Sequence, residues 1–174
     1  MSSQLDIRPV SAMDLDAISA LHGRAFGPGR YARTAYRLRD GTPLYTPQCR
    51  AAYLDGTLIA ALRYTPITIG GVGGALLLGP VAVEPASKGK GFGKTLIAKS
   101  IEDAAHNGFR LVLLVGDMSY YARFGFNRVP PGQIKLPGPV NPERLLAREL
   151  VADALALYSG LVVADCANSP VSNI

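Results

Sequence analysis

The 174-residue sequence contains no tryptophan, two cysteines and two histidines. Cys49 and Cys166 lie far apart in the sequence, and neither is near a pair of histidines. This pattern excludes a disulfide framework and the ligand spacings of a metal centre, so we expect no metal cofactor. Sparse cysteine also fits a reducing compartment, which predicts a cytoplasmic protein.

Long apolar runs are missing as well. No stretch reaches 18 apolar residues, and the N-terminal segment lacks a basic start followed by an apolar run. We therefore expect neither a secretory signal nor contact with a membrane. The net charge is 18 − 13 = +5, but the basic residues are scattered among acidic ones and form no stripe interleaved with aromatic residues. Nucleic acid is therefore not an expected partner.

The composition, with 48% hydrophobic residues, is enough to bury a sizeable core, and the length fits a single domain over residues 1–174. In the first half, apolar periodicity and turn residues predict a strand, two helices and a hairpin. The expected elements are a strand over 5–10, a helix over 14–26 capped by Ser11, a helix over 31–39, and strands over 50–54 and 58–69 around Asp55-Gly56.

The second half begins with a strand–loop–helix–strand pattern. Residues 75–83 and 111–115 are nearly all apolar, as in strands buried on both faces, and an amphipathic helix is expected between them over 93–106. A crossover helix between buried strands predicts a parallel, right-handed unit. Gly116-Asp117 then ends the strand and caps a short helix over 119–124. A strand is expected over 145–151, whereas the pattern of 152–163 is ambiguous.

The loop between strand and helix is rich in glycine and lysine: Lys88-Gly89-Lys90-Gly91-Phe92-Gly93-Lys94. Glycines allow several backbone N–H groups to converge, and the helix N-terminus adds partial positive charge, so the loop suits a pyrophosphate. It is neither a Walker loop, which needs Gly-Lys-Ser/Thr, nor the dinucleotide fingerprint, which needs a third glycine. A tight turn with solvated lysines, or a nucleotide- or nucleic-acid-binding loop, remains an alternative.

Three segments together carry a family resemblance. Val81-Ala82-Val83-Glu84-Pro85, the glycine loop, and Tyr120-Tyr121-Ala122-Arg123-Phe124-Gly125-Phe126 resemble the GCN5-related N-acetyltransferase (GNAT) superfamily, and most of all its YhbS-type predicted N-acetyltransferases. The family's phosphate loop is Arg/Gln-x-x-Gly-x-Gly/Ala. Lys88 stands at its first position, which is a departure from that pattern.

The resemblance implies an α/β fold of the GNAT type, with a mixed central sheet, a splayed parallel strand pair and a crossover helix after the phosphate loop. N-terminal helices over about 13–40 would precede a CoA-binding core over about 75–126, with C-terminal strands over about 144–165. Acetyl-CoA would be the co-substrate of an N-acetyltransferase acting on a primary amine. The chain would be a monomer or a homodimer.

The same resemblance assigns residues. Tyr121 would protonate the leaving CoA thiolate, as a protonated tyrosine with an ordinary pKa near 10 is able to do. The residues expected to bind the cofactor are Val81, Ala82, Val83, Lys88, Gly89, Lys90, Gly91, Phe92, Gly93, Lys94, Tyr120 and Phe124. Gly79-Pro80 would form a bulge in the first splayed strand.

Some points stay open at the level of the sequence. No carboxylate occupies residues 76–78, where some family members place a general base, and Glu84 lies at the phosphate end of its strand. The acceptor is either a small-molecule amine or a protein or peptide amine. A regulatory module that binds acyl-CoA without turnover is a further alternative.

Overall fold

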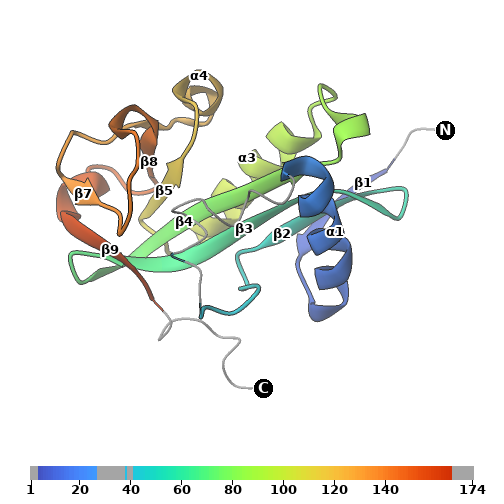
Figure 1. Cartoon of the computed structure of the whole chain (residues 1–174), viewed down its shortest axis with the longest axis horizontal. Coiled ribbons are helices and arrows are strands. Elements are labelled where there is room, and N and C mark those ends of the chain that lie inside the picture. Colours follow the sequence, from blue (N-terminus) through green and yellow to red (C-terminus); the bar gives the residue numbers. More distant parts are fainter. Residues whose placement is uncertain (1–3, 27–37, 39–40, 166–174) are drawn as a thin grey trace.

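The computed structural model describes residues 4–26, 38 and 41–165. The helix predicted over 31–39 lies outside these residues apart from Leu38, and Cys166 lies outside them as well. Most described strands form a mixed sheet in the order β1-β2-β3-β4-β5-β8-β6, with β9 paired to β3 and β7 (Figure 1). The strands are β1 Leu5–Pro9, β2 Arg50–Leu54, β3 Thr57–Ile69, β4 Val72–Val83, β5 Leu111–Val115, β6 Asn127–Arg128, β7 Ile134–Lys135, β8 Leu145–Glu149 and β9 Gly160–Ala164.

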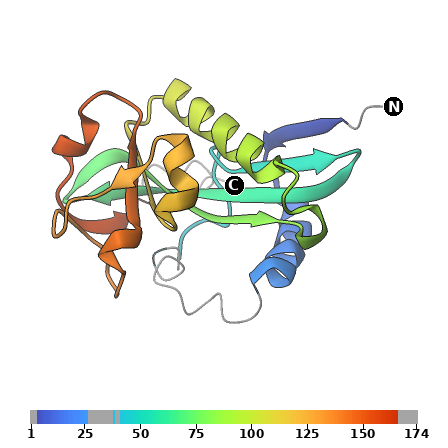
Figure 2. The same cartoon turned by 90° about the horizontal axis from the view of Figure 1, so that it is seen from above.

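Helices cover both faces of the sheet. The α-helices are α1 Leu15–Phe26, α3 Phe92–His106 and α4 Met118–Tyr121, with short 3-10 turns at Ala12–Asp14, Pro85–Ser87, Ala122–Phe124, Pro142–Arg144 and Ala154–Leu157. Figure 2 shows α3 and α1 on opposite faces. The apolar side of α3 packs on β3, β4 and β5, and α1 packs on Ala61 and Ala82 from the other side.

The hairpin predicted at Asp55-Gly56 is confirmed, and a second one follows it. Asp55 and Gly56 both have positive φ, of 49° and 85°, which is the backbone of the tight turn that joins β2 to β3. Gly70 and Gly71, with φ of 58° and 84°, join β3 to β4 in the same way. A side chain at Gly70 would also collide with the backbone carbonyl of Ser159, because an added Cβ would lie 1.9 Å from its oxygen.

The predicted parallel unit is confirmed. β4 and β5 pair in parallel, with Ala75 opposite Leu111 and Leu77 opposite Leu113, and α3 crosses between them. A hydrogen bond of 2.9 Å joins the hydroxyls of Tyr64 on β3 and Ser100 on α3, both buried. This bond ties the crossover helix to the centre of the sheet.

The C-terminal region differs from the expectation in detail. The strand expected over 145–151 ends at Glu149. The ambiguous residues 152–163 form a 3-10 turn, Ala154–Leu157, and most of β9. In β9 only Val162 is fully buried, while Leu161 and Val163 are about half exposed, so burial and hydrophobicity do not coincide along this strand. That mismatch explains why its sequence showed no strand periodicity.

Candidate active site

The central feature of the site is a gap between two parallel strands. β4 and β5 pair only from Ala75 to Leu77, although β4 continues to Val83 and β5 to Val115. Beyond that point Leu114 and Val115 pair with β8 alone, and residues 81–83 pair with β3 alone. The two strands therefore splay apart, as predicted, and one edge of β4 has no strand of the described residues beside it.

The register of β4 determines which backbone groups face this opened edge. The N–H of Glu84 donates to the carbonyl of Ile59 at 2.7 Å, and Ala82 lies opposite Ala61. Antiparallel pairs alternate between hydrogen-bonded and non-hydrogen-bonded positions. The backbone N–H and C=O of Val81 and Val83 therefore point away from β3, toward the gap, whereas those of Ala82 point to β3.

A bulge precedes this segment. Leu62 lies opposite Val81 and Tyr64 opposite Leu78, so two residues of β4, Gly79 and Pro80, face one residue of β3. The bulge predicted at Gly79-Pro80 is thus confirmed. An extra residue on one strand bends it and increases its twist, which turns the following segment of β4 away from β5.

The glycine loop lies at the end of the opened strand. Gly89 and Gly91 have φ of 83° and 85°, a conformation that favours glycine, and a Cβ on either would meet nothing within 4 Å. Lys88, Lys90 and Lys94 are exposed. Their charges lie beside the N-terminus of α3, where the N–H groups of a first helical turn have no intrahelical partner, a combination that suits an anion.

Two residues of the loop pack inward and bring the helix close to the strand. α3 begins at Phe92, which is partly buried against the core. Gly93 is buried, and a Cβ there would lie 3.0 Å from the Cγ2 of Val83. The absence of a side chain at Gly93 therefore lets the N-terminus of α3 approach the opened end of β4.

The tyrosine helix, which comprises α4 and the following 3-10 turn Ala122–Phe124, faces the glycine loop across the gap. α4 begins after Asp117, whose backbone carbonyl accepts hydrogen bonds from Tyr120 and Tyr121, while its side chain makes no capping bond. Asp117 thus occupies the predicted N-cap position, but its side chain does not cap the helix. The Tyr120 hydroxyl lies 3.7 Å from the position that a Cβ of Gly93 would occupy, so this side chain reaches from α4 to the first turn of α3.

Tyr121 occupies a more enclosed position. Its ring packs edge-on against Tyr120 at a centroid distance of 5.0 Å and against Phe126 at 5.8 Å. Burial, followed by the phenol of Tyr120 and the carboxylate of Asp117, raises the pKa of Tyr121 to about 12. The hydroxyl therefore keeps its proton at neutral pH. Among the described residues, none hydrogen-bonds this hydroxyl.

Glu84 is engaged elsewhere. Both its carboxylate oxygens accept hydrogen bonds from Arg24 at the end of α1, with Nε–Oε2 and Nη2–Oε2 distances of 3.1 and 2.7 Å. The carboxylate is thus directed toward α1. Arg24 and Glu84 are 60 residues apart in the sequence, so no local pattern could predict their contact.

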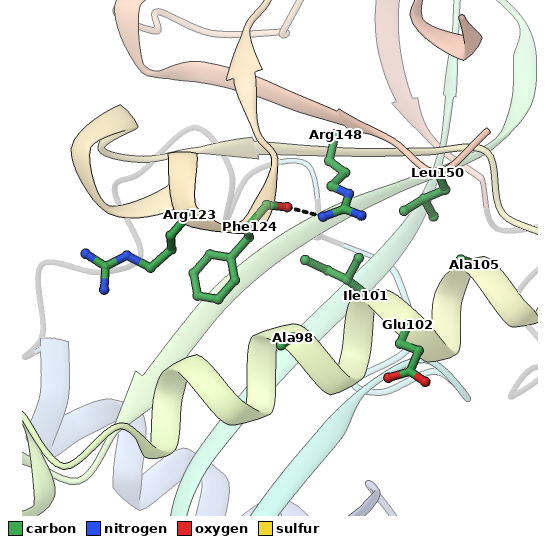
Figure 3. Close-up of a pocket in the computed structure, with 8 residues that line it drawn as sticks. All are labelled: Ala98, Ile101, Glu102, Ala105, Arg123, Phe124, Arg148 and Leu150. Carbon is green, nitrogen blue, oxygen red and sulfur yellow. Dashed lines mark hydrogen bonds between the residues drawn. The ribbon is translucent and has the colours of Figure 1, made fainter. Parts of the chain in front are cut away.

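Phe124 is buried and forms part of the wall of a cavity of about 390 Å³ between α3 and β8. Figure 3 shows Phe124 opposite the α3 residues Ala98 and Ile101, with Arg148 reaching across from β8. The Arg148 guanidinium donates a hydrogen bond to the backbone carbonyl of Phe124. This contact, also invisible in the sequence, fastens the end of the tyrosine helix to the sheet.

No group of three or more His, Cys, Asp or Glu side chains within 4–26, 38 and 41–165 is arranged to hold a metal ion. In the same part of the chain, no helix has both the length and the apolar character needed to cross a membrane.

Comparisons with known proteins agree with this geometry. The family model of the acetyltransferase (GNAT) domain matches residues 6–129. The uncharacterized N-acetyltransferase YhbS of Escherichia coli K12 is 27% identical over 161 residues, covering 90% of this chain and 93% of that protein.

Two solved structures share the fold. Escherichia coli YhbS in complex with CoA has a TM-score of 0.81 at 24% identity, covering 95% of this chain and 92% of that one. A GNAT family acetyltransferase from Brucella melitensis in complex with acetyl-CoA has a TM-score of 0.62 at 28% identity, covering 83% and 95%. With more than half of its length matched by the family model, the chain belongs to the GNAT family of acetyltransferases.

Proposed function

We propose that this protein transfers the acetyl group of acetyl-CoA to a primary amine. The observation that carries the proposal is the opened edge of β4, which runs from the bulge at Gly79-Pro80 to the glycine loop before α3. The Tyr121 phenol, which burial keeps protonated, packs against the same core cluster as Val81 and Val83. Acetyl-CoA has a part that suits each feature. Its amide-containing pantetheine arm suits the opened edge of β4, its pyrophosphate suits the glycine loop, and its thioester suits a protonated tyrosine. The similar structures from Escherichia coli and Brucella melitensis hold CoA and acetyl-CoA.

Each group of residues then has a binding role. The backbone groups of Val81 and Val83 pair with the pantetheine arm as an added strand would, and Ala82 sets their spacing. The pyrophosphate lies on the loop from Lys88 to Lys94, against the N-terminus of α3. Tyr120 reaches from α4 to the glycine loop, where its hydroxyl and the side chain of Val83 both lie close to Gly93.

The reaction needs one bond formed and one broken. The amine nitrogen attacks the thioester carbonyl carbon, and a backbone N–H on the opened edge, that of Val81 or Val83, stabilises the developing oxyanion. The C–S bond breaks as the Tyr121 hydroxyl gives its proton to the departing thiolate. The proton lost by the amine restores the tyrosine through solvent, so the products are the acetylated amine and CoA. Holding both reactants in line supplies much of the rate enhancement.

The test is a transfer assay with acetyl-CoA and a panel of amines, polyamines, aminoglycosides and peptides. We expect acetyl-CoA to raise the melting temperature, because it binds the native state, and at least one amine to release CoA and gain one acetyl group by mass spectrometry. The best acceptors will show whether small molecules or peptides are used. Binding of acetyl-CoA with no acetylated product from any amine would instead favour a regulatory acyl-CoA-binding module.

Replacing Glu84 with glutamine should leave the pH profile of kcat/KM in place. With Glu84 paired to Arg24, the reactive amine loses its proton to water, so kcat/KM should rise toward the pKa of the acceptor and move when a less basic acceptor is used. The cost to stability should be below about 1 kcal/mol, because the ion pair is partly exposed.

The profile is measured for the wild type, Glu84→Gln and the control Glu102→Gln, whose carboxylate is exposed on α3. A large loss of rate specific to Glu84→Gln, together with an acidic limb that does not follow the acceptor, would identify Glu84 as the general base.

A further inference from the structure

Gly116 follows β5 directly and is buried beside the tyrosine helix. Its φ lies outside the left-handed region, so the backbone conformation itself does not require glycine. The surrounding side chains do. A Cβ at this position would lie 2.6 Å from Cε2 and 3.0 Å from Cδ2 of Tyr121, and 3.1 Å from Cδ1 of Leu114.

The backbone at Gly116 has little freedom to yield. Its N–H donates to the carbonyl of Arg144 at 2.9 Å, which continues the ladder between β5 and the chain entering β8. Three further aromatic rings surround the Tyr121 ring, with centroid distances of 5.0 Å for Tyr120, 5.8 Å for Phe126 and 6.2 Å for Phe124. The backbone of Gly116 therefore forms one wall of the space that the Tyr121 ring occupies.

The helix that carries the ring is held from behind as well. Gly125, with φ of 84°, ends the turn after α4, and a Cβ there would lie 2.8 Å from the Nη1 of Arg148. The missing side chain lets Arg148 reach the carbonyl of Phe124. With the helix end fastened in this way, a side chain at Gly116 would displace the ring rather than the whole of α4.

We propose that Gly116 is a positioning residue, which sets the place of the Tyr121 hydroxyl by leaving room for its ring. This inference rests on the proposed role of Tyr121 as the acid. Carbon atoms in contact are about 3.5–4.0 Å apart, so a methyl group at Gly116 must move the ring edge by about 1 Å. The hydroxyl is bonded to Cζ, the ring carbon next to Cε2, so it moves with this edge, and a misplacement of about 1 Å can cost 10²-fold in rate.

The experiment is a double-mutant cycle of Gly116→Ala, Tyr121→Phe and the two together. Gly23→Ala serves as the matched control, because Gly23 is exposed on α1 and a Cβ there meets nothing within 4 Å. We measure kcat with a fixed amine and the Kd of acetyl-CoA. Gly116→Ala should lower kcat by about 10-fold to 10²-fold with less than about a threefold change in Kd. In the Tyr121→Phe background it should have little further effect on kcat, because the hydroxyl that it displaces is already gone.

The outcomes separate the inference from the proposed function. An equal loss of kcat in both backgrounds, or no loss in the wild type, overturns the role of Gly116. A full rate in Tyr121→Phe alone overturns the acid assignment instead. If Gly116→Ala folds poorly, its loss of stability is measured by urea unfolding, both in the wild-type background and in a Tyr121→Ala background. Recovery of stability there supports the collision with the ring, whereas an equal loss in that background overturns it.

Discussion

Tyr121→Phe should lower kcat by about 10²-fold while the Kd of acetyl-CoA stays close to that of the wild type. The thiolate leaves poorly without a proton, and general acid catalysis contributes about 10²–10⁴-fold. The phenyl ring keeps the edge-on contacts with Tyr120 and Phe126, so the substitution removes the hydroxyl and preserves the packing. The rate is measured in single-turnover experiments, where acetyl transfer limits the signal.

The control for this substitution is Tyr45→Phe, which removes a hydroxyl from the cluster around Val10, Cys49 and Ala51, on a different part of the sheet. It should keep the wild-type kcat. The raised pKa of Tyr121 adds a second readout. Because the proton is lost only as pH rises through about 12, no decline of kcat from this group should occur below about pH 11. An unchanged single-turnover rate in Tyr121→Phe would show that the residue only packs.

Gly91→Asp should weaken acetyl-CoA binding on the order of 10²-fold more than Gly91→Asn does. The two side chains have the same shape, and both asparagine and aspartate tolerate the left-handed φ of 85° better than other residues. They differ in charge. A carboxylate about 4 Å from a phosphate costs about 4 kcal/mol at an effective dielectric constant of 20, and solvent screening reduces that value.

Isothermal titration of each variant with acetyl-CoA measures this difference. The pair Gly71→Asp and Gly71→Asn provides the control, since Gly71 has φ of 84° and open space around it but lies in the β3–β4 turn, at the other end of β4. Neither should change the affinity. Equal affinities for the two Gly91 variants would contradict the assignment of a phosphate to this loop.

Much of the fold could be predicted because its signals are local. Solid apolar runs mark β4 and β5, Asp55-Gly56 marks a tight hairpin, and glycines between strand and helix mark the loop. The residue pattern of the β9 region did not by itself predict a strand, because about half of the surface of Leu161 and Val163 remains exposed.

The site was harder to predict wherever it depends on distant partners. The Arg24–Glu84 pair joins two segments that carry no pattern in common. The sequence pattern indicates only that Gly116 ends a strand. The structure shows that the ring of Tyr121, five residues later, occupies the space that a side chain at Gly116 would need. Such requirements follow from three-dimensional packing, which single-residue propensities do not encode.

The opened edge of β4 has a consequence for how this site tolerates mutation. The polar groups at residues 81 and 83 belong to the main chain, so exchanging valine for another apolar residue leaves them in place, and proline alone would remove an N–H. Their side chains pack on the core under α3, and the Cγ2 of Val83 also lies close to Gly93. For the proposed CoA site, apolar substitutions of similar size at residues 81 and 83 should therefore be tolerated, while the permissible changes at Gly89, Gly91, Gly93 and Gly116 are few. Several of the positions most sensitive to mutation are thus ones that have no side chain.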